Sequence, residues 1–386
     1  MLPANPAGHP ETRGPAARRG LDSLRDAAAL YLNPLGLLSG VAAAEAVAAG
    51  LAWRVAGGWT AASLVRVSAR RAGGGAEGWL LPVGEFSRWL NDNSGPAATR
   101  LRGLADRLQA ARAPWAGLPL DRPEVMGIVN TTPDSFSDGG EHEAPAAAIA
   151  HGLALRAAGA AILDVGGEST RPGAAEISEQ QEIDRVVPVI RGLVAEGALV
   201  SVDTRRAAVM AAALDAGARI LNDVEALRQP GTLDLAARAR APVVLMHMQG
   251  QPRTMQADPR YDVAALDVFD WLEARLVACE SAGLGRESAL VDPGIGFGKA
   301  LDHNLQIMGM LGLYHGLGAG ILLGASRKSF IAKLDGTADP KRRLGGSLAA
   351  SLDGWARGAQ IVRVHDVHET VQALRIAAAI GQVQQF

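Results

Sequence analysis

Eight short apolar runs recur along the last two thirds of this 386-residue chain, separated by alanine-rich stretches long enough to form helices. Runs of three to five apolar and often β-branched residues predict buried strands. The runs are residues 125–129, 161–165, 199–202, 219–221, 243–246, 289–291, 320–323 and 360–364. Eight strand–helix units in about 260 residues match the size of a (β/α)8 TIM barrel. A doubly wound open sheet is the alternative α/β fold.

Each run ends in polar or ionisable residues. They are Asn130, Asp164, Asp203, Asn222 with Asp223, His247, Asp292, Ser326-Arg327-Lys328, and Arg363 with His365. Any one of them has a structural interpretation, because an Asp or Asn after a strand often caps the next helix. His247 by itself is best interpreted as a satisfied core histidine. The carboxyl ends of parallel barrel strands converge, however, so the whole set predicts a polar pocket above an apolar core.

Two kinds of chemistry are present in this set. Carboxylate and amide groups match a planar heterocycle with an amino group and ring N–H, such as a guanine or pterin edge. They belong to Asp203, Asn222 and Asp292. Positive charge and N–H donors suit a phosphate. They belong to Lys328, Arg363 and His365.

Three glycine-rich or proline-rich segments accompany the strand ends. NTTPDSFSDGG follows the first run and GGESTRPGA follows the second, and such polar loops on adjacent strands predict mobile lids over the pocket. An ordinary Pro/Gly turn is the alternative for each. The glycines of DPGIGFGK have GxGxG spacing, which is a weak dinucleotide signal, and they indicate a turn instead.

Composition excludes several classes of function. A net charge of −2 gives no electrostatic reason to expect nucleic acid. The single cysteine, Cys279, rules out an internal disulfide and fits a reducing cytoplasm. The longest apolar run, residues 36–53, is mostly Ala and Gly and contains Glu45, so we expect a packed soluble helix instead of a membrane segment.

The first 120 residues differ from the rest, with 13 Arg against 8 acidic residues. Residues 1–20 are predicted to be disordered. Residues 21–120 are predicted to form a small accessory region, with an amphipathic helix over 101–113 and a boundary among the prolines of 114–123. The catalytic domain would be residues 121–386. An interaction or dimer-supporting module is one possible role for the accessory region.

The chain resembles the dihydropteroate synthase family from about Val125 to Leu374, and the resemblance does not cover residues 1–120. Eight motifs occur in the family's order. They are MGIVNTTPDSFSDGG, ILDVGGESTRPGA, VSVDT, ILNDV, LMHMQGQPRTMQ, LVDPGIGFGK, GASRKSF and RVHDV. Thr131 and Glu225 are minor departures that remove no residue assigned to the chemistry.

The resemblance implies a TIM barrel that joins p-aminobenzoate to a dihydropterin carrying a CH2-pyrophosphate, giving dihydropteroate and pyrophosphate. It also implies Mg2+, a homodimer and a p-aminobenzoate site of the kind that sulfonamide drugs target, although the sequence alone does not give the susceptibility of this chain to those drugs. The residues implied to bind the pterin are Asp203, Asn222, Asp292 and Lys328, with Met246 and Phe297 flanking the ring. Asn130 would bind Mg2+, and Arg363 and His365 would bind pyrophosphate. Around p-aminobenzoate would lie Phe136, Thr170, Arg171, Pro172 and Ser329.

The implied catalytic residues are Asp138, Arg171 and Lys328. Neutralising the charge on pyrophosphate makes it a good leaving group, so we expect a dissociative substitution with a cationic pterin intermediate. Two alternatives share the barrel: a methyl transfer from a folate to a corrinoid protein, and a non-catalytic pterin-binding paralogue. The intact loops and the SRKS and RVHD motifs favour the synthase.

Overall fold

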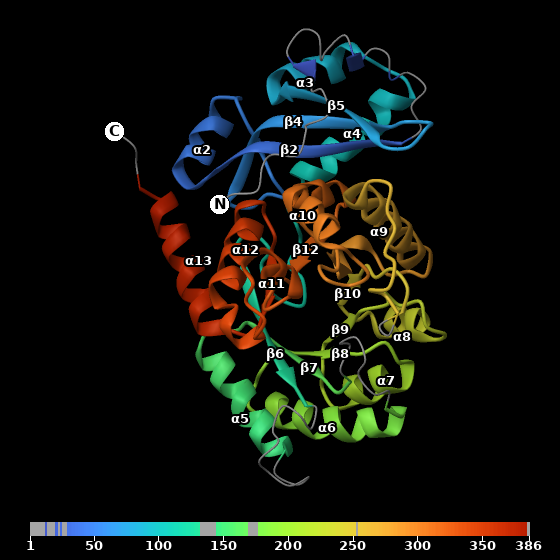
Figure 1. Cartoon of the computed structure of the whole chain (residues 1–386), viewed down its shortest axis with the longest axis vertical. Helices are drawn as coiled ribbons and strands as arrows, with labels where there is room; N and C mark the ends of the chain where they lie inside the picture. Colours follow the sequence, from blue (N-terminus) through green and yellow to red (C-terminus); the bar gives the residue numbers. More distant parts are fainter. Residues whose placement is uncertain are drawn as a thin grey trace.

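The protein consists of an antiparallel sheet with its own helices and a closed barrel of parallel strands (Figure 1). The computed structural model describes residues 12–13, 20–21, 24, 29–131, 144–168, 177–251 and 254–383. The region predicted to be disordered and both predicted lid loops fall largely outside these residues.

The barrel contains the eight predicted strands, neighbouring in chain order, and β13 pairs with β6 to close it. The strands are β6 (Glu124–Asn130), β7 (Ile162–Gly166), β8 (Val200–Asp203), β9 (Ile220–Asp223), β10 (Val243–Met246), β11 (Ala289–Asp292), β12 (Gly320–Leu323) and β13 (Ile361–Val364). Closure confirms the TIM barrel and excludes the open sheet. The predicted strand limits are correct to within two residues.

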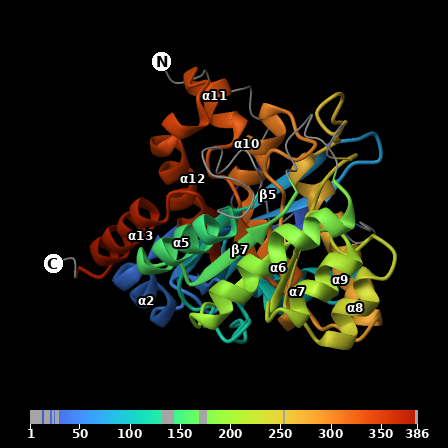
Figure 2. The ribbon, with the colours of Figure 1, turned by 90° about the horizontal axis from the view of Figure 1, so that it is seen from below.

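Helices surround the barrel, as Figure 2 shows from below. They are α5 (Ala144–Ala157), α6 (Glu179–Ala195), α7 (Ala207–Asp215), α8 (Thr232–Ala239), α9 (Ala264–Ser281), α10 (Leu301–Gly309), α11 (Ser329–Asp335), α12 (Leu344–Ala356) and α13 (Val367–Gly381). Short 3-10 turns are η3 (Arg286–Ser288), η4 (Leu311–Leu317) and η5 (Pro340–Arg342). None of the helices in the described part of the chain is long and apolar enough to cross a membrane.

An antiparallel sheet precedes the barrel. Its strands are β1 (Thr12–Arg13), β2 (Leu30–Ser39), β3 (Trp53–Arg54), β4 (Thr60–Arg70) and β5 (Ala76–Pro82), with β1 parallel to β5. Its helices are α2 (Gly40–Ala48), α3 (Val83–Asp92) and α4 (Pro96–Gln109). The single packed helix expected over 36–53 is wrong. Residues 36–39 belong to β2, in which Leu37, Leu38 and Ser39 pair with β4, and only 40–48 are helical.

The predicted amphipathic helix is α4, although it begins five residues earlier than expected. Leu101, Leu104 and Leu108 share one buried face, at the spacing of successive helical turns. This face belongs to the hydrophobic core that the sheet shares with the barrel helices. The ring of Tyr31 meets that of Phe269 edge-on at 5.6 Å.

The interior of the barrel at the amino-terminal end of the strands, the lower end, is filled by apolar side chains from the strands. They are Met126, Ile162, Ile220, Val244, Leu290, Leu322 and Ile361. Trp115 and Leu120, from the segment before β6, pack against them, and the indole N–H of Trp115 donates to the Ser288 carbonyl at 3.0 Å. The domain boundary at 120 stays a prediction, but this segment packs with the barrel.

Candidate active site

Strand alternation places a polar layer directly above the apolar one. Successive side chains on a strand point to opposite faces, so a residue two positions beyond a core residue faces the same interior. Ile162, Ile220, Leu290 and Ile361 lie in the lower layer. The residues two positions later are Asp164, Asn222, Asp292 and Arg363. The carboxyl ends of the strands therefore enclose a polar site, as predicted.

Arg363 is the centre of this layer. Its Nε donates to Asp164 Oδ2 at 2.6 Å and its second terminal nitrogen donates to Asp203 Oδ2 at 2.7 Å. Asp164 and Asp203 lie on β7 and β8, two and three strands from β13 around the barrel. The guanidinium therefore crosses the barrel interior and joins two strands that do not pair with its own.

Asp164 orients a second ligand-binding candidate. Asn222 Nδ2 donates to Asp164 Oδ2 at 3.0 Å, which leaves the amide oxygen of Asn222 as the group available to a ligand N–H. Asp164 is completely buried, and its Oδ1 has no hydrogen-bond partner in the described structure. A buried unsatisfied carboxylate oxygen is costly, so it marks a place where a ligand donor would be favourable.

One guanidinium between two carboxylates can neutralise the charge of only one. Burial raises the pKa of Asp203 to about 7, with the Asp164 carboxylate adding to the rise and Arg363 opposing it. The site therefore holds a carboxyl group that titrates near neutral pH, which is characteristic of functional sites.

Lys328 and Asp292 form the opposite side of the layer. The ammonium of Lys328 lies 3.9 Å from the centroid of the Phe297 ring, in a cation–π contact. Burial lowers the pKa of Lys328 to about 8, although the Asp292 carboxylate acts in the other direction. Burial raises the pKa of Asp292, whose Oδ1 accepts the Gly294 N–H at 2.7 Å.

An apolar wall lies beside these charges. Phe297 packs against a cluster of buried side chains that is separate from the main core. Its members are Val224, Met246, Met248 and Met255. Met246 and Phe297, predicted to flank a planar ring, therefore belong to one surface.

The glycine-rich segment between Asp292 and Lys299 is a turn, as expected from its weak dinucleotide spacing. Gly294, Gly296 and Gly298 have φ values of +68°, +82° and +60°, a region that favours glycine. A Cβ on Gly294 would stand 1.9 Å from the His247 carbonyl oxygen, so a larger residue has no room there. The turn supports Phe297 beside Lys328.

Lys299 is a buried residue of this turn that sequence reasoning left unassigned. Its ammonium contacts His247 Nδ1 at 2.9 Å and donates to the carbonyls of Gly294 at 2.9 Å and Phe297 at 3.0 Å. Burial lowers the pKa of His247 to about 2, with Lys299 adding to the fall. His247 is therefore a neutral, satisfied core histidine, as interpreted from the sequence. The lysine of the DPGIGFGK motif was the available signal for Lys299.

His365 and Ser329 lie at the ends of the last two strand–loop units. The His365 backbone N–H donates to Ser326 Oγ at 3.2 Å, so the hydroxyl is free to donate to His365 Nδ1 at 3.1 Å. Burial lowers the pKa of His365 to about 3, and Arg327 and Arg363 add to the fall. Ser329 is the first residue of α11.

Six predicted site residues have no contact with the polar layer that the described structure shows. Phe136, Asp138, Thr170, Arg171 and Pro172 lie outside the described residues. Asn130 ends β6 and is half-buried at the carboxyl end of the barrel, where it pairs with Gly166. Among the residues that are described, no three His, Cys, Asp or Glu side chains gather closely enough to hold a metal ion.

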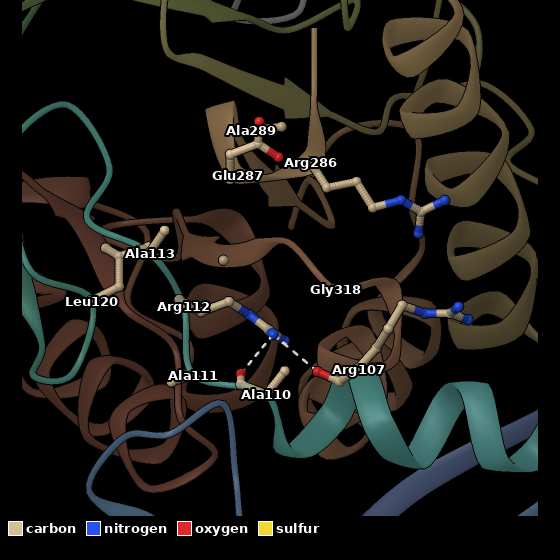
Figure 3. A pocket seen from close by; sticks show the side chains of 11 residues that line it. Arg107, Ala110, Ala111, Arg112, Ala113, Leu120, Arg286, Glu287, Ala289 and Gly318 are labelled. Carbon is tan, nitrogen blue, oxygen red and sulfur yellow. Dashed lines mark hydrogen bonds between the residues drawn. The ribbon is translucent and has the colours of Figure 1, made fainter.

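A cavity of about 280 Å³ lies at the other end of the barrel (Figure 3). Ala289 and Gly320, the first residues of β11 and β12, line it, together with Arg112 from the connection to the antiparallel sheet. The Arg112 guanidinium donates to the carbonyls of Arg107, Ala110, His315 and Ala319. This cavity is therefore remote from the polar layer. The Arg112 guanidinium that lines it already donates its hydrogen bonds to backbone carbonyls.

The fold and the polar layer define a TIM-barrel protein with a polar site at the carboxyl ends of its strands. Comparison with known proteins identifies the class as the pterin-binding enzymes. The family described as pterin binding enzyme matches residues 126–365. The dihydropteroate synthase of Escherichia coli strain K12 is 46% identical over 268 residues, which cover 69% of this chain and 95% of the relative. This chain belongs to the dihydropteroate synthase family.

Solved structures lead to the same family. Xanthomonas albilineans dihydropteroate synthase with 4-aminobenzoic acid has a TM-score of 0.66 and 50% identity, covering 70% of this chain and 97% of its own. The Yersinia pestis enzyme in a sulfonamide drug complex has a TM-score of 0.66 and 47% identity, covering 69% and 97%. These relatives leave about a third of the chain unmatched, and the family match begins only at residue 126.

The raised pKa of Asp203 predicts a pH-dependent stability. Folding raises the pKa of the Asp203 carboxyl from 3.8 to about 7, so the folded state binds this proton more tightly than the unfolded chain. The resulting stabilisation is fully present below the pKa of the unfolded chain, and it is lost as the pH rises to 7. Replacing Asp203→Asn should flatten the fall in unfolding free energy between pH 4 and 7, by up to about 1.4 kcal/mol per pH unit. Urea denaturation across this range measures the effect. Asp302→Asn, at an exposed position on α10, is the matched control, and equal slopes in both variants would contradict the assignment.

Proposed function

We propose that this chain is a dihydropteroate synthase that joins (7,8-dihydropterin-6-yl)methyl diphosphate to 4-aminobenzoate, with release of 7,8-dihydropteroate and diphosphate. The observation that carries the proposal is the polar layer in which Arg363 holds Asp164 and Asp203 above an apolar barrel core. Membership of the family and the X. albilineans structure with 4-aminobenzoic acid support the substrate assignment.

The pterin ring would bind in the polar layer. Its N–H groups are donors, and the Asn222 oxygen, Asp203 and Asp292 are acceptors that could match them. Lys328 would donate to the ring carbonyl or a ring nitrogen. The apolar wall with Met246 and Phe297 would cover one face of the ring, since planar heterocycles are commonly held between hydrophobic side chains.

Arg363 and His365 would bind the diphosphate. With Ser326 donating to Nδ1, the His365 Nε2–H is left as a donor to a phosphate oxygen. Lys328 would add positive charge from the neighbouring strand end. A departing diphosphate would then leave into a region whose N–H donors are already positioned.

Mg2+ fits the chemistry of Asn130. The amide oxygen of Asn130 is a hard ligand, and Mg2+ typically takes one or two protein oxygens and completes its shell with water and phosphate oxygens. When bound, Mg2+ would neutralise charge on the diphosphate. The absence of a larger carboxylate cluster among described residues is compatible with a site completed by substrate.

The reaction would proceed by departure of diphosphate before the amine attacks. The methylene C–O bond breaks, diphosphate takes the electron pair, and the pterin ring delocalises the positive charge. The neutral aryl amine then forms the C–N bond and loses a proton. Asp138 would stabilise the cation, with Arg171 and Lys328 as the other catalytic residues. Phe136, Thr170, Pro172 and Ser329 would surround 4-aminobenzoate and help exclude water.

The activity itself is tested by diphosphate release. We expect release that depends on both dihydropterin diphosphate and 4-aminobenzoate and that falls strongly after removal of Mg2+ with EDTA. A coupled phosphate assay measures the rate, and mass spectrometry identifies dihydropteroate. Pterin binding without diphosphate release would instead indicate the non-catalytic paralogue, and methyl transfer to a corrinoid protein would indicate the other alternative.

Lys328 should give the reaction an alkaline limit. Since burial lowers its pKa to about 8, the ammonium loses its proton above this pH, and kcat/KM for the pterin substrate should fall about tenfold per pH unit. Lys328→Arg should lower kcat/KM at pH 7, because the guanidinium has a different shape, yet remove the limb near pH 8. Lys333→Arg, at an exposed position on α11, should retain it. Persistence of the limb in Lys328→Arg would refute the role.

A homodimer is supported by an uncovered apolar face on α13, which lies at the outer edge of the molecule (Figure 1). Ile376 and Ile380 are 58% and 70% exposed and share one face of the helix, and Val383, two residues beyond the end of α13, is 66% exposed. Exposed large apolar side chains gathered on one helix face are typical of an interface. We expect Ile380→Glu to convert dimer to monomer in analytical ultracentrifugation, whereas Leu334→Glu, at another exposed position, should not. A monomeric parent protein would contradict the proposal.

A further inference from the structure

The connection between β4 and β5 contacts the barrel domain at Asp262, just before α9. The Gly75 backbone N–H donates to both oxygens of Asp262, at 2.7 and 3.0 Å, and Arg70 donates to the same side chain at 3.4 Å. Gly74 and Gly75 have φ values of +93° and +74°, which turn the backbone N–H towards Asp262. We refer to residues 70–75 as the β4–β5 hairpin.

Arg70 strengthens this contact through its other partners on α9. Its terminal nitrogen donates to Asp267 at 2.7 Å and to Asp270 at 2.8 Å. Its Nε donates to the Tyr31 hydroxyl, which in turn donates to Asp270 at 2.7 Å. The Asp262 backbone N–H donates to Asp267 at 2.8 Å. The hairpin therefore contacts the start of α9 through several hydrogen bonds and ion pairs, and not through one isolated surface ion pair.

Asp262 belongs to the segment that leads from β10 to α9, residues 247–263. Its neighbour Tyr261 donates its hydroxyl to the Gly298 carbonyl at 2.8 Å, and Gln256 donates to the Gly296 carbonyl at 2.5 Å. A Cβ on Gly296 would stand 3.1 Å from Lys328 Cδ, so this turn is in close contact with Lys328. The same turn carries Phe297.

A short chain of contacts therefore joins the antiparallel sheet to the candidate site. It runs from Gly75 to Asp262, through the adjacent Tyr261 to Gly298, and so to Phe297 and Lys328. Met255, from the same segment, also packs in the apolar wall with Phe297. The family match begins at residue 126, so the hairpin is an addition to the matched barrel.

We propose that the β4–β5 hairpin positions the pterin-binding surface, by holding Asp262 and so the turn that presents Phe297 beside Lys328. The proposal rests on the proposed function for the identity of the ligand. Asp262 is a positioning residue, since it acts through its own segment, in which Tyr261 and Gln256 donate to the carbonyls of the Gly294–Gly298 turn. The N-terminal sheet then has a role in substrate affinity beyond covering the barrel helices.

Asp262→Ala tests the proposal, with Arg100→Gln as a matched control. Arg100 also joins the sheet region to α9, through a bidentate pair with Glu273 at 2.8 and 2.7 Å, but Glu273 lies beyond the segment 247–263. Asp262→Ala should raise KM for dihydropterin diphosphate about threefold to fivefold, as expected for loss of a partly exposed charged contact, with kcat nearly unchanged. Arg100→Gln should leave KM unchanged. Asp262→Asn, which keeps an acceptor for Gly75, should restore part of the affinity.

Hydrogen exchange provides a readout that does not depend on turnover. Peptides containing Tyr261 and the Gly294–Gly298 turn should exchange faster in full-length Asp262→Ala than in the parent or in Arg100→Gln. Equal KM values and equal exchange in the two variants would overturn the inference, because a merely structural contact would act alike in both. A parent protein without diphosphate release would refute the proposed function, while faster exchange confined to Asp262→Ala would still support the positioning role.

Discussion

Closure of eight parallel strands forces every second side chain into one interior, and the arrangement of this protein follows from that constraint. The interior positions at the amino-terminal end of the strands are apolar and fill the space, and Trp115 and Leu120 close this end of the barrel. Two residues further along β7 and β13, the same geometry places Asp164 and Arg363 in the interior, and Asp203 follows at the end of β8. Because these strands converge, Arg363 pairs with both carboxylates.

Burying these charges has chemical consequences. Water would screen the same groups on a surface, but inside the barrel Asp203 titrates near pH 7 and Lys328 near pH 8. Each carboxylate and cation that is not fully matched by its neighbours gains from a polar ligand. The proposed pterin diphosphate offers both N–H donors and anionic oxygens, so it complements both kinds of unmatched group.

The structure also reassigns relationships within the predicted site. The sequence assigns Asp203 to the pterin and Arg363 to the phosphate, but the two side chains form one ion pair, so the two subsites are in direct contact. Asp164 is a strand end in the sequence pattern, and the structure shows that it orients both Arg363 and Asn222. The structure adds Lys299, which holds the glycine turn by donating to its carbonyls. The roles of the remaining site residues stay predictions.

The sequence by itself determined the eight strands to within two residues and the polar strand ends, because β-branched runs are local properties of the chain. Closure of these strands into a barrel, which the family resemblance implied, was decided by the pairing of β13 with β6. The family motifs likewise identified the candidate residues without coordinates. Only the tertiary structure decided which groups pair, since Arg363 and Asp164 are separated by 199 positions in the chain. It also decided that residues 36–39 are strand and that the hairpin reaches Asp262, 187 positions from Gly75. Such contacts depend on how distant elements pack, and no local pattern of residues records them.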